Sequence, residues 1–75
     1  MYIYKVIYKK DMESPQFLFI AIREKLKNIG DNPYIKIDHK KGYIEFKILK
    51  PIINTDLEKD LKRIRDIEKI VLVNS

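Results

Sequence analysis

The 75-residue sequence predicts an α+β domain with the element order β-α-β-β-α-β, in which two helices cover one face of an antiparallel sheet. Two observations carry most of this prediction. The segments Tyr34–Asp38 and Tyr43–Ile48 alternate apolar and polar residues with the period of two that a half-buried strand requires. A helical apolar pattern lies on either side of this pair, and a strand-like segment lies toward each end of the sequence.

The first two elements are a strand and a helix. Residues 2–9 are rich in aromatic and β-branched side chains, which favour a strand. Ser14 and Pro15 suit the N-cap and the first position of a helix that runs to about Ile29. Gly30 can then take the left-handed position that follows many helices.

A hairpin and a second helix follow. The loop of residues 39–42 joins the two hairpin strands, and Gly42 supplies the positive φ that a bulged hairpin loop needs. Pro51 ends the third strand, and Thr55 with Glu58 forms a capping-box pattern at the start of the second helix. One narrow apolar stripe on that helix consists of Leu57, Leu61 and Ile64.

The C-terminal segment has two interpretations. Residues 70–73 are apolar and mostly β-branched, which predicts a fourth strand. No Gly or Pro separates this run from the second helix, so a single longer final helix over residues 66–73 is the alternative. With the fourth strand, the layout is a ferredoxin-like, split β-α-β sandwich, which hosts many functions and does not by itself indicate a chemistry.

Composition argues against an enzyme. The sequence has no cysteine, which excludes disulfides, thiol nucleophiles and thiolate metal sites, and its two glycines form no phosphate loop. We interpret His39 as a solvated turn residue rather than a metal ligand, because its neighbour Asp38 points to the opposite face and a third ligand is lacking. Ser14 and Thr55 are interpreted as helix caps rather than nucleophiles. We therefore expect no catalytic residue, no cofactor and no metal.

The sequence shows no signal-peptide pattern and no apolar run of membrane-spanning length, so we expect a cytoplasmic protein that does not bind a membrane. The net charge of +5 lies in residues 1–50, with 11 Lys and Arg against 6 Asp and Glu; residues 51–75 hold 5 of each. This bias fits a nucleic-acid or acidic partner, and equally a solvated surface. The charge-rich, cysteine-free composition is typical of thermophile proteins, although an AT-rich genome explains the abundant Ile and Lys equally well.

The sheet face opposite the helices is the predicted contact surface. The first strand can turn either Tyr4 or Lys5 toward the helices, and we prefer Tyr4 because an unpaired buried lysine would be costly. Large apolar groups then occupy the middle of the open face, a feature of contact surfaces. On the first helix, Phe17 lies at the edge of the apolar stripe and Ile20 lies outside it. The residues predicted for a protein interface are Ile3, Lys5, Ile7, Phe17, Ile20, Tyr34 and Tyr43.

Aromatic residues among lysines also suggest a nucleic-acid surface. Residues 41–43 match the start of an RNA-recognition-motif signature, but Ile44 and Glu45 stand where that signature needs a small residue and a second stacking aromatic. We therefore expect weak, salt-sensitive RNA or DNA contact at most. The residues predicted to make it are Lys36, Lys40, Lys41 and Lys47.

One family has a similar layout over most of the chain. The residues that carry the likeness are 4–8, 14–26, 42–48 and the stripe of Leu57, Leu61 and Ile64. In the layout of these residues, the sequence resembles the small dimerisation subunit of the archaeal and eukaryotic KEOPS complex, which modifies tRNA. The family's more specific pattern, Ala-Asp and then Leu-Arg near the start of the last helix with a following Asn-Ser, is missing from residues 50–58.

The resemblance implies a non-catalytic interaction or dimerisation subunit of a larger RNA-modifying assembly, as a homodimer or with another protein. It also implies a C-terminus that is helical through Ile70. A free-standing basic nucleic-acid-binding domain, using the sheet face and the lysine-rich hairpin, is the alternative. A small-ligand regulatory domain is a third reading, for which the sequence shows no effector-binding loop.

Overall fold

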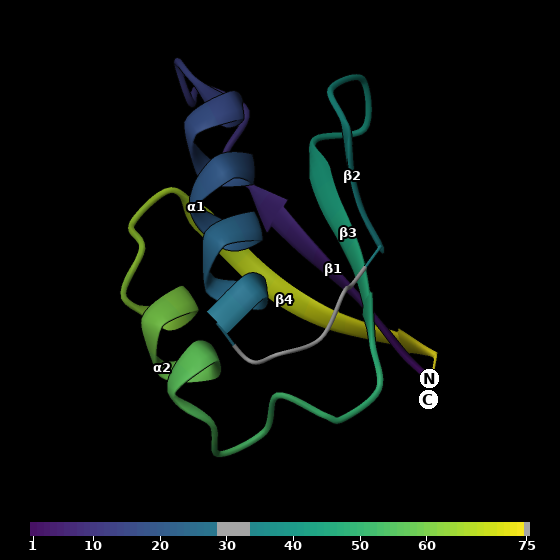
Figure 1. Cartoon of the computed structure of the whole chain (residues 1–75). Coiled ribbons are helices and arrows are strands. Elements are labelled where there is room, and N and C mark those ends of the chain that lie inside the picture. Colours follow the sequence, from purple (N-terminus) through teal and green to yellow (C-terminus); the bar gives the residue numbers. More distant parts are fainter. Residues whose placement is uncertain (29–33, 75) are drawn as a thin grey trace.

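The sheet and the helices form two layers, as Figure 1 shows for the computed structural model, which describes residues 1–28 and 34–74. This confirms the predicted α+β class and the β-α-β-β-α-β order. The elements are β1 (Tyr2–Tyr8), α1 (Pro15–Asn28), β2 (Tyr34–Asp38), β3 (Tyr43–Ile48), α2 (Asp56–Lys62) and β4 (Ile67–Asn74).

The strands lie in the order β2-β3-β1-β4, and every neighbouring pair is antiparallel. β1 and β3 are therefore the central strands, and β2 and β4 are the two edges. Because β1 and β4 run in opposite directions, the N-terminus and the C-terminus lie at the same end of the sheet (Figure 1).

The C-terminal segment is a strand, longer than the predicted run of residues 70–73. The alternative of a longer final helix, which the KEOPS resemblance implies through Ile70, is wrong. Helix α2 ends at Lys62, where the backbone N–H of Arg63 donates to the carbonyls of Asp60 and Leu61. The backbone N–H of Lys9 then donates to the Asp66 carbonyl at 2.8 Å, which fixes the start of β4 beside the end of β1.

Helix α1 begins at Pro15, as predicted, and is described as far as Asn28. Its predicted end at Ile29 and the cap at Gly30 lie outside the described residues. The apolar stripe packs on the sheet with Leu18, Ile22 and Leu26 buried. An ion pair of 3.2 Å between Lys25 and Asp60 joins α1 to α2.

The cap of α2 differs in one detail from the predicted capping box. The Thr55 hydroxyl accepts a hydrogen bond from the backbone N–H of Glu58, as predicted. The Glu58 carboxylate, however, accepts from the backbone N–H of Asn54 rather than from that of Thr55. The Thr55 N–H donates instead to the carbonyl of Ile52. Asn54 has a φ of 61°, a conformation that asparagine tolerates better than most residues.

The core lies between the helices and the inner face of the sheet. Tyr4 belongs to this core, with its ring stacked on Phe46 at a centroid distance of 5.4 Å. The Tyr4 hydroxyl accepts a hydrogen bond from the backbone N–H of Ile52, so one side chain joins β1 to the connection that precedes α2. The preferred orientation of the first strand is therefore confirmed. The buried core residues are Tyr4, Val6, Tyr8, Leu18, Ile22, Leu26, Ile44, Phe46, Ile48, Ile52, Leu57 and Leu61.

The hairpin has the predicted bounds. Gly42 has a φ of 77°, as expected for the loop. Asp38 stabilises the turn twice, because its carboxylate accepts from the backbone N–H of Lys41 and its carbonyl accepts from that of Gly42.

Candidate interaction surfaces

The strand registers arrange the open face of the sheet in rows. The central row crosses all four strands. Glu45 of β3 lies between Lys36 of β2 and Lys5 of β1, and Lys5 in turn lies opposite Val71 of β4. Lys36 and Glu45 form an ion pair of 3.6 Å. The charges of this row therefore compensate one another at the β2 side, and the row ends in an apolar residue at the β4 edge.

Two lysines of the open face lie over tyrosine rings. The Lys5 ammonium lies 4.4 Å from the centre of the Tyr43 ring, and the Lys47 ammonium lies 5.0 Å from the centre of the Tyr34 ring. Both distances suit a cation–π interaction. These lysines thus lie along the sheet and contact partners within the chain, rather than extending into solvent.

Ile3 and Ile7 lie on this face but are half-buried, not fully exposed. Ile3 pairs with Lys47 and Ile7 pairs with Tyr43, so long side chains stand beside each isoleucine. The fold thus brings together five of the residues predicted for a protein interface. They are Ile3, Lys5, Ile7, Tyr34 and Tyr43.

Phe17 and Ile20 are not part of that surface, because they belong to α1 on the other side of the sheet. Both are exposed, and Phe17 is the more so at 73%. They offer a second exposed apolar area near the start of the helix.

The lysines predicted to contact nucleic acid fall into two groups. Lys36 and Lys47 have partners on the open face, as described above. Lys40 and Lys41 lie exposed in the hairpin loop. Of these four predicted lysines, the two that lie off the sheet are therefore those of the loop.

The edge of β4 is an apolar surface that the sequence reasoning missed. Val71, Leu72 and Val73 are consecutive and are 36%, 49% and 49% exposed. The run of residues 70–73 was visible as uncharged and β-branched, which is the signal that could have identified it. Its position at the edge of the sheet, however, depends on the strand order.

A groove of about 310 Å³ runs beside β4 on the helix side. Most of its walls are apolar, and Ile53, which forms part of them, is itself largely exposed. The groove is lined by Tyr4, Pro51, Ile52, Ile53, Glu58, Lys62, Ile70 and Leu72. The apolar surface of the edge strand thus continues toward α2.

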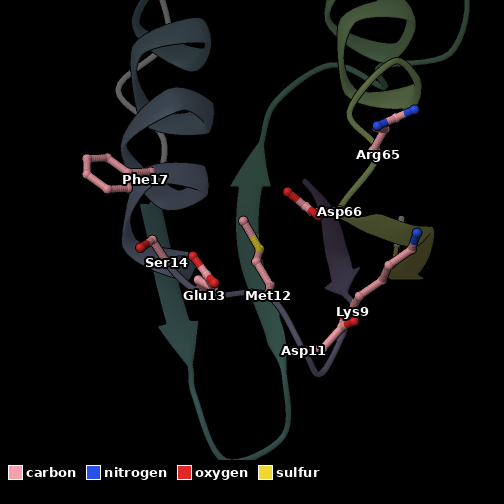
Figure 2. A pocket seen from close by; sticks show the side chains of 8 residues that line it. All are labelled: Lys9, Asp11, Met12, Glu13, Ser14, Phe17, Arg65 and Asp66. Atoms are coloured by element: carbon pink, nitrogen blue, oxygen red, sulfur yellow. The ribbon is translucent and has the colours of Figure 1, made fainter.

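A larger hollow of about 810 Å³ lies near the N-terminal end of α1 (Figure 2). Its charged lining consists of three carboxylates and two cations, so it lacks the excess of positive charge that would favour a phosphate group. Figure 2 shows the Phe17 ring pointing away from the other labelled side chains. The lining residues are Lys9, Asp11, Met12, Glu13, Ser14, Phe17, Arg65 and Asp66.

Tyr8 is the one group in the described residues with a clear pKa shift. Burial raises the pKa of its phenol, and the nearby Asp38 carboxylate raises it further. Its hydroxyl has no hydrogen-bond partner within the described part of the chain. It lies in the core, away from the exposed surfaces, and we assign it a structural role.

Among residues 1–28 and 34–74, no three His, Cys, Asp or Glu side chains gather as a metal site would require. None of the helices in those ranges has the length and apolar character needed to cross a bilayer. Comparison with protein-family models, with curated proteins and with solved structures finds no match to this chain. Function is therefore inferred from the surfaces described above.

Proposed function

We propose that this chain is a non-catalytic interaction domain that assembles with a protein partner through apolar side chains at its surface. One observation carries the proposal: β4 is an edge strand with three consecutive apolar residues exposed, from Val71 to Val73. Isolated domains usually protect such an edge with a charged residue or proline, because exposed edges pair with other chains. The opposite edge, β2, carries such charges at Lys36 and Asp38, whereas on β4 the charged Glu68 and Lys69 precede the apolar run and leave it unprotected.

The contacts of the lysines support the same function. Lys5, Lys36 and Lys47 contact Tyr43, Glu45 and Tyr34. A phosphate that approached the open face would have to displace these contacts and would meet the Glu45 carboxylate. A partner that makes apolar contact with the β4 edge would not have to displace these lysine contacts.

A cytoplasmic assembly that modifies RNA is the setting that the KEOPS resemblance implies. Because that resemblance also implies a helix where β4 stands, the proposal rests on the exposed surface rather than on the resemblance. A free-standing nucleic-acid-binding domain is the second candidate, and the exposed Lys40 and Lys41 of the hairpin loop favour it.

Light scattering after gel filtration and co-purification with a tagged chain test the proposal together. Leu72→Ala removes exposed apolar surface from β4, and the double variant Lys40→Ala with Lys41→Ala removes exposed charge from the loop. We expect Leu72→Ala to weaken assembly about tenfold or more, because buried interface anchors typically contribute about 2 kcal/mol. The lysine variant should assemble like the wild type, since rim charges mainly change association rates.

Two results would reject the proposal. One is a wild-type chain that remains monomeric and retains no protein. The other is the reverse ranking, in which the loop lysines are needed and Leu72 is not.

A further inference from the structure

We propose that the partner is a second copy of this chain, and that the two β4 strands pair antiparallel to join both sheets into one of eight strands. This inference rests on the proposed function, because it names the occupant of the same exposed edge. Each copy contributes the four-stranded sheet β2-β3-β1-β4, so the two β4 strands would meet in the middle.

The middle of β4 has the regular geometry that such pairing needs. It forms four successive pairs with β1, from Ile7 with Lys69 to Tyr4 with Leu72. The register shifts lie outside this stretch, between Ile7 and Tyr8 and between Ile3 and Tyr4. A β-bulge is one of the devices that discourages edge pairing, and here the irregularities leave the central stretch undisturbed.

The sequence of this stretch is compatible with itself in antiparallel orientation. Identical edges that pair antiparallel are related by a two-fold axis, and the same face of both sheets then points the same way. With the axis beside Val71, Ile70 of each copy lies opposite Leu72 of the other, and Lys69 lies opposite Val73, which stands just beyond the regular stretch, at a register shift. Like charges do not face each other in this register, whereas an axis beside Lys69 would place two lysines together.

The groove beside β4 extends the contact beyond the strand. Ile70 and Leu72 line it in one copy, and the paired strand would bring the same two side chains of the second copy to its open side. A stable interface buries about 800 Å² of each partner, which is about one-seventh of the 5396 Å² of accessible surface here. An area of that size requires the exposed Ile53 and the groove as well as the strand edge.

Disulfide trapping tests the pairing, because the chain has no cysteine of its own. Val71→Cys places one thiol in each copy at the two-fold axis, where opposite Cα atoms are about 4.5–5.5 Å apart, within reach of a disulfide. Lys69→Cys is the control on the same strand, since its two thiols would stand about 13 Å apart along the strands. Lys36→Cys is the control on the β2 edge. We expect Val71→Cys to form covalent dimers at least tenfold faster than either control.

A charge at the same position provides a second measurement. Val71→Glu places a carboxylate opposite Lys5, so the monomer gains a favourable cross-strand charge pair. Tyr34→Glu is the matched control on the β2 edge, because it likewise places a carboxylate opposite a lysine, Lys47. We expect sedimentation to show dimer dissociation at least tenfold easier for Val71→Glu and nearly unchanged for Tyr34→Glu.

Cross-linking of either control as fast as Val71→Cys would overturn the inference. A wild-type chain that stays monomeric but retains a different protein, which Leu72→Ala releases, would also overturn it while leaving the proposed function intact. A monomer that retains no protein would refute both.

Discussion

Tyr4 and Leu72 face each other across the β1–β4 ladder, yet Tyr4 is only 7% exposed and Leu72 is 49% exposed. The two side chains belong to one row on the helix side of the sheet, and the row passes from the core to the surface. Tyr4 is covered because β1 has neighbours on both sides, whereas β4 has a neighbour on one side. An apolar row that ends in an exposed leucine leaves surface that a partner can bury.

Tyr4→Phe should lower the free energy of unfolding by about 1–3 kcal/mol. The substitution keeps the ring that stacks on Phe46 but leaves the buried N–H of Ile52 without its acceptor. Urea denaturation measures the effect. Tyr34→Phe removes a hydroxyl from an exposed ring and should change stability by about 0.5 kcal/mol or less. Equal effects of the two variants would show that the Tyr4 hydrogen bond contributes little.

Tyr8→Phe should leave stability at neutral pH unchanged or raise it slightly, because it removes a buried hydroxyl that lacks a partner among the described residues. The difference in stability between Tyr8→Phe and the wild type should be larger in alkaline solution. The pKa of Tyr8 is raised in the folded chain above its ordinary value of 10.0, so above that pH the unfolded chain loses the proton first. Stability of the wild type should therefore fall as the pH rises beyond about 10.

Thermal unfolding of the wild type and of Tyr8→Phe, measured between neutral and strongly alkaline pH, isolates the contribution of Tyr8. The other tyrosines and the lysines are the same in the two proteins. The Tyr8→Phe protein should lose less stability over this range. Parallel curves for the two proteins would argue against a raised pKa.

Gly42→Ala should destabilise the chain by about 1–2 kcal/mol. Nothing lies within 4 Å of the position of an added Cβ, so the cost comes from the φ of 77° rather than from a clash. Gly42→Asn should cost less, because asparagine adopts positive φ more readily. Chemical denaturation of both variants checks this order, and an equal loss in both would indicate that the new side chain disturbs the hairpin in another way.

Binding to a single-stranded RNA oligonucleotide should be weak and should fall steeply with salt. Removing Lys40 and Lys41 together should lower the salt slope of log K by about 1.4, the value for two phosphate contacts on a single strand. Lys36→Ala should change it less, because Lys36 is paired with Glu45. Fluorescence anisotropy at several salt concentrations measures the slopes. Tight, base-specific binding at physiological salt would favour the nucleic-acid-binding candidate.

The hairpin was predictable to the residue because its signals are local. Alternation with a period of two fixes Tyr34–Asp38 and Tyr43–Ile48, and Gly42 marks the loop between them. The full extent of β4 was less predictable, since the register shifts near its ends interrupt the pairing with β1. The residues beyond 70–73 accordingly show no clear alternation.

The candidate surfaces were predictable only in part. Strand alternation placed Ile3 and Ile7 on the open face, but their partial burial depends on side chains from a neighbouring strand. The contacts of Lys5 with Tyr43 and of Lys47 with Tyr34 likewise require the registers between strands. The exposure of Val71 and Leu72 follows from the position of β4 at the edge, which local patterns do not specify.

Hydrogen exchange of the β4 amides shows whether two copies of this chain pair through β4. In an isolated chain, the amides of β4 that point away from β1 should exchange as fast as the outward amides of the β2 edge. If two β4 strands pair, these β4 amides should become protected as the protein concentration rises, and the outward β2 amides should not. Equally fast exchange at both edges at every concentration, with no protected amide on the outer side of β4, would rule out pairing through β4.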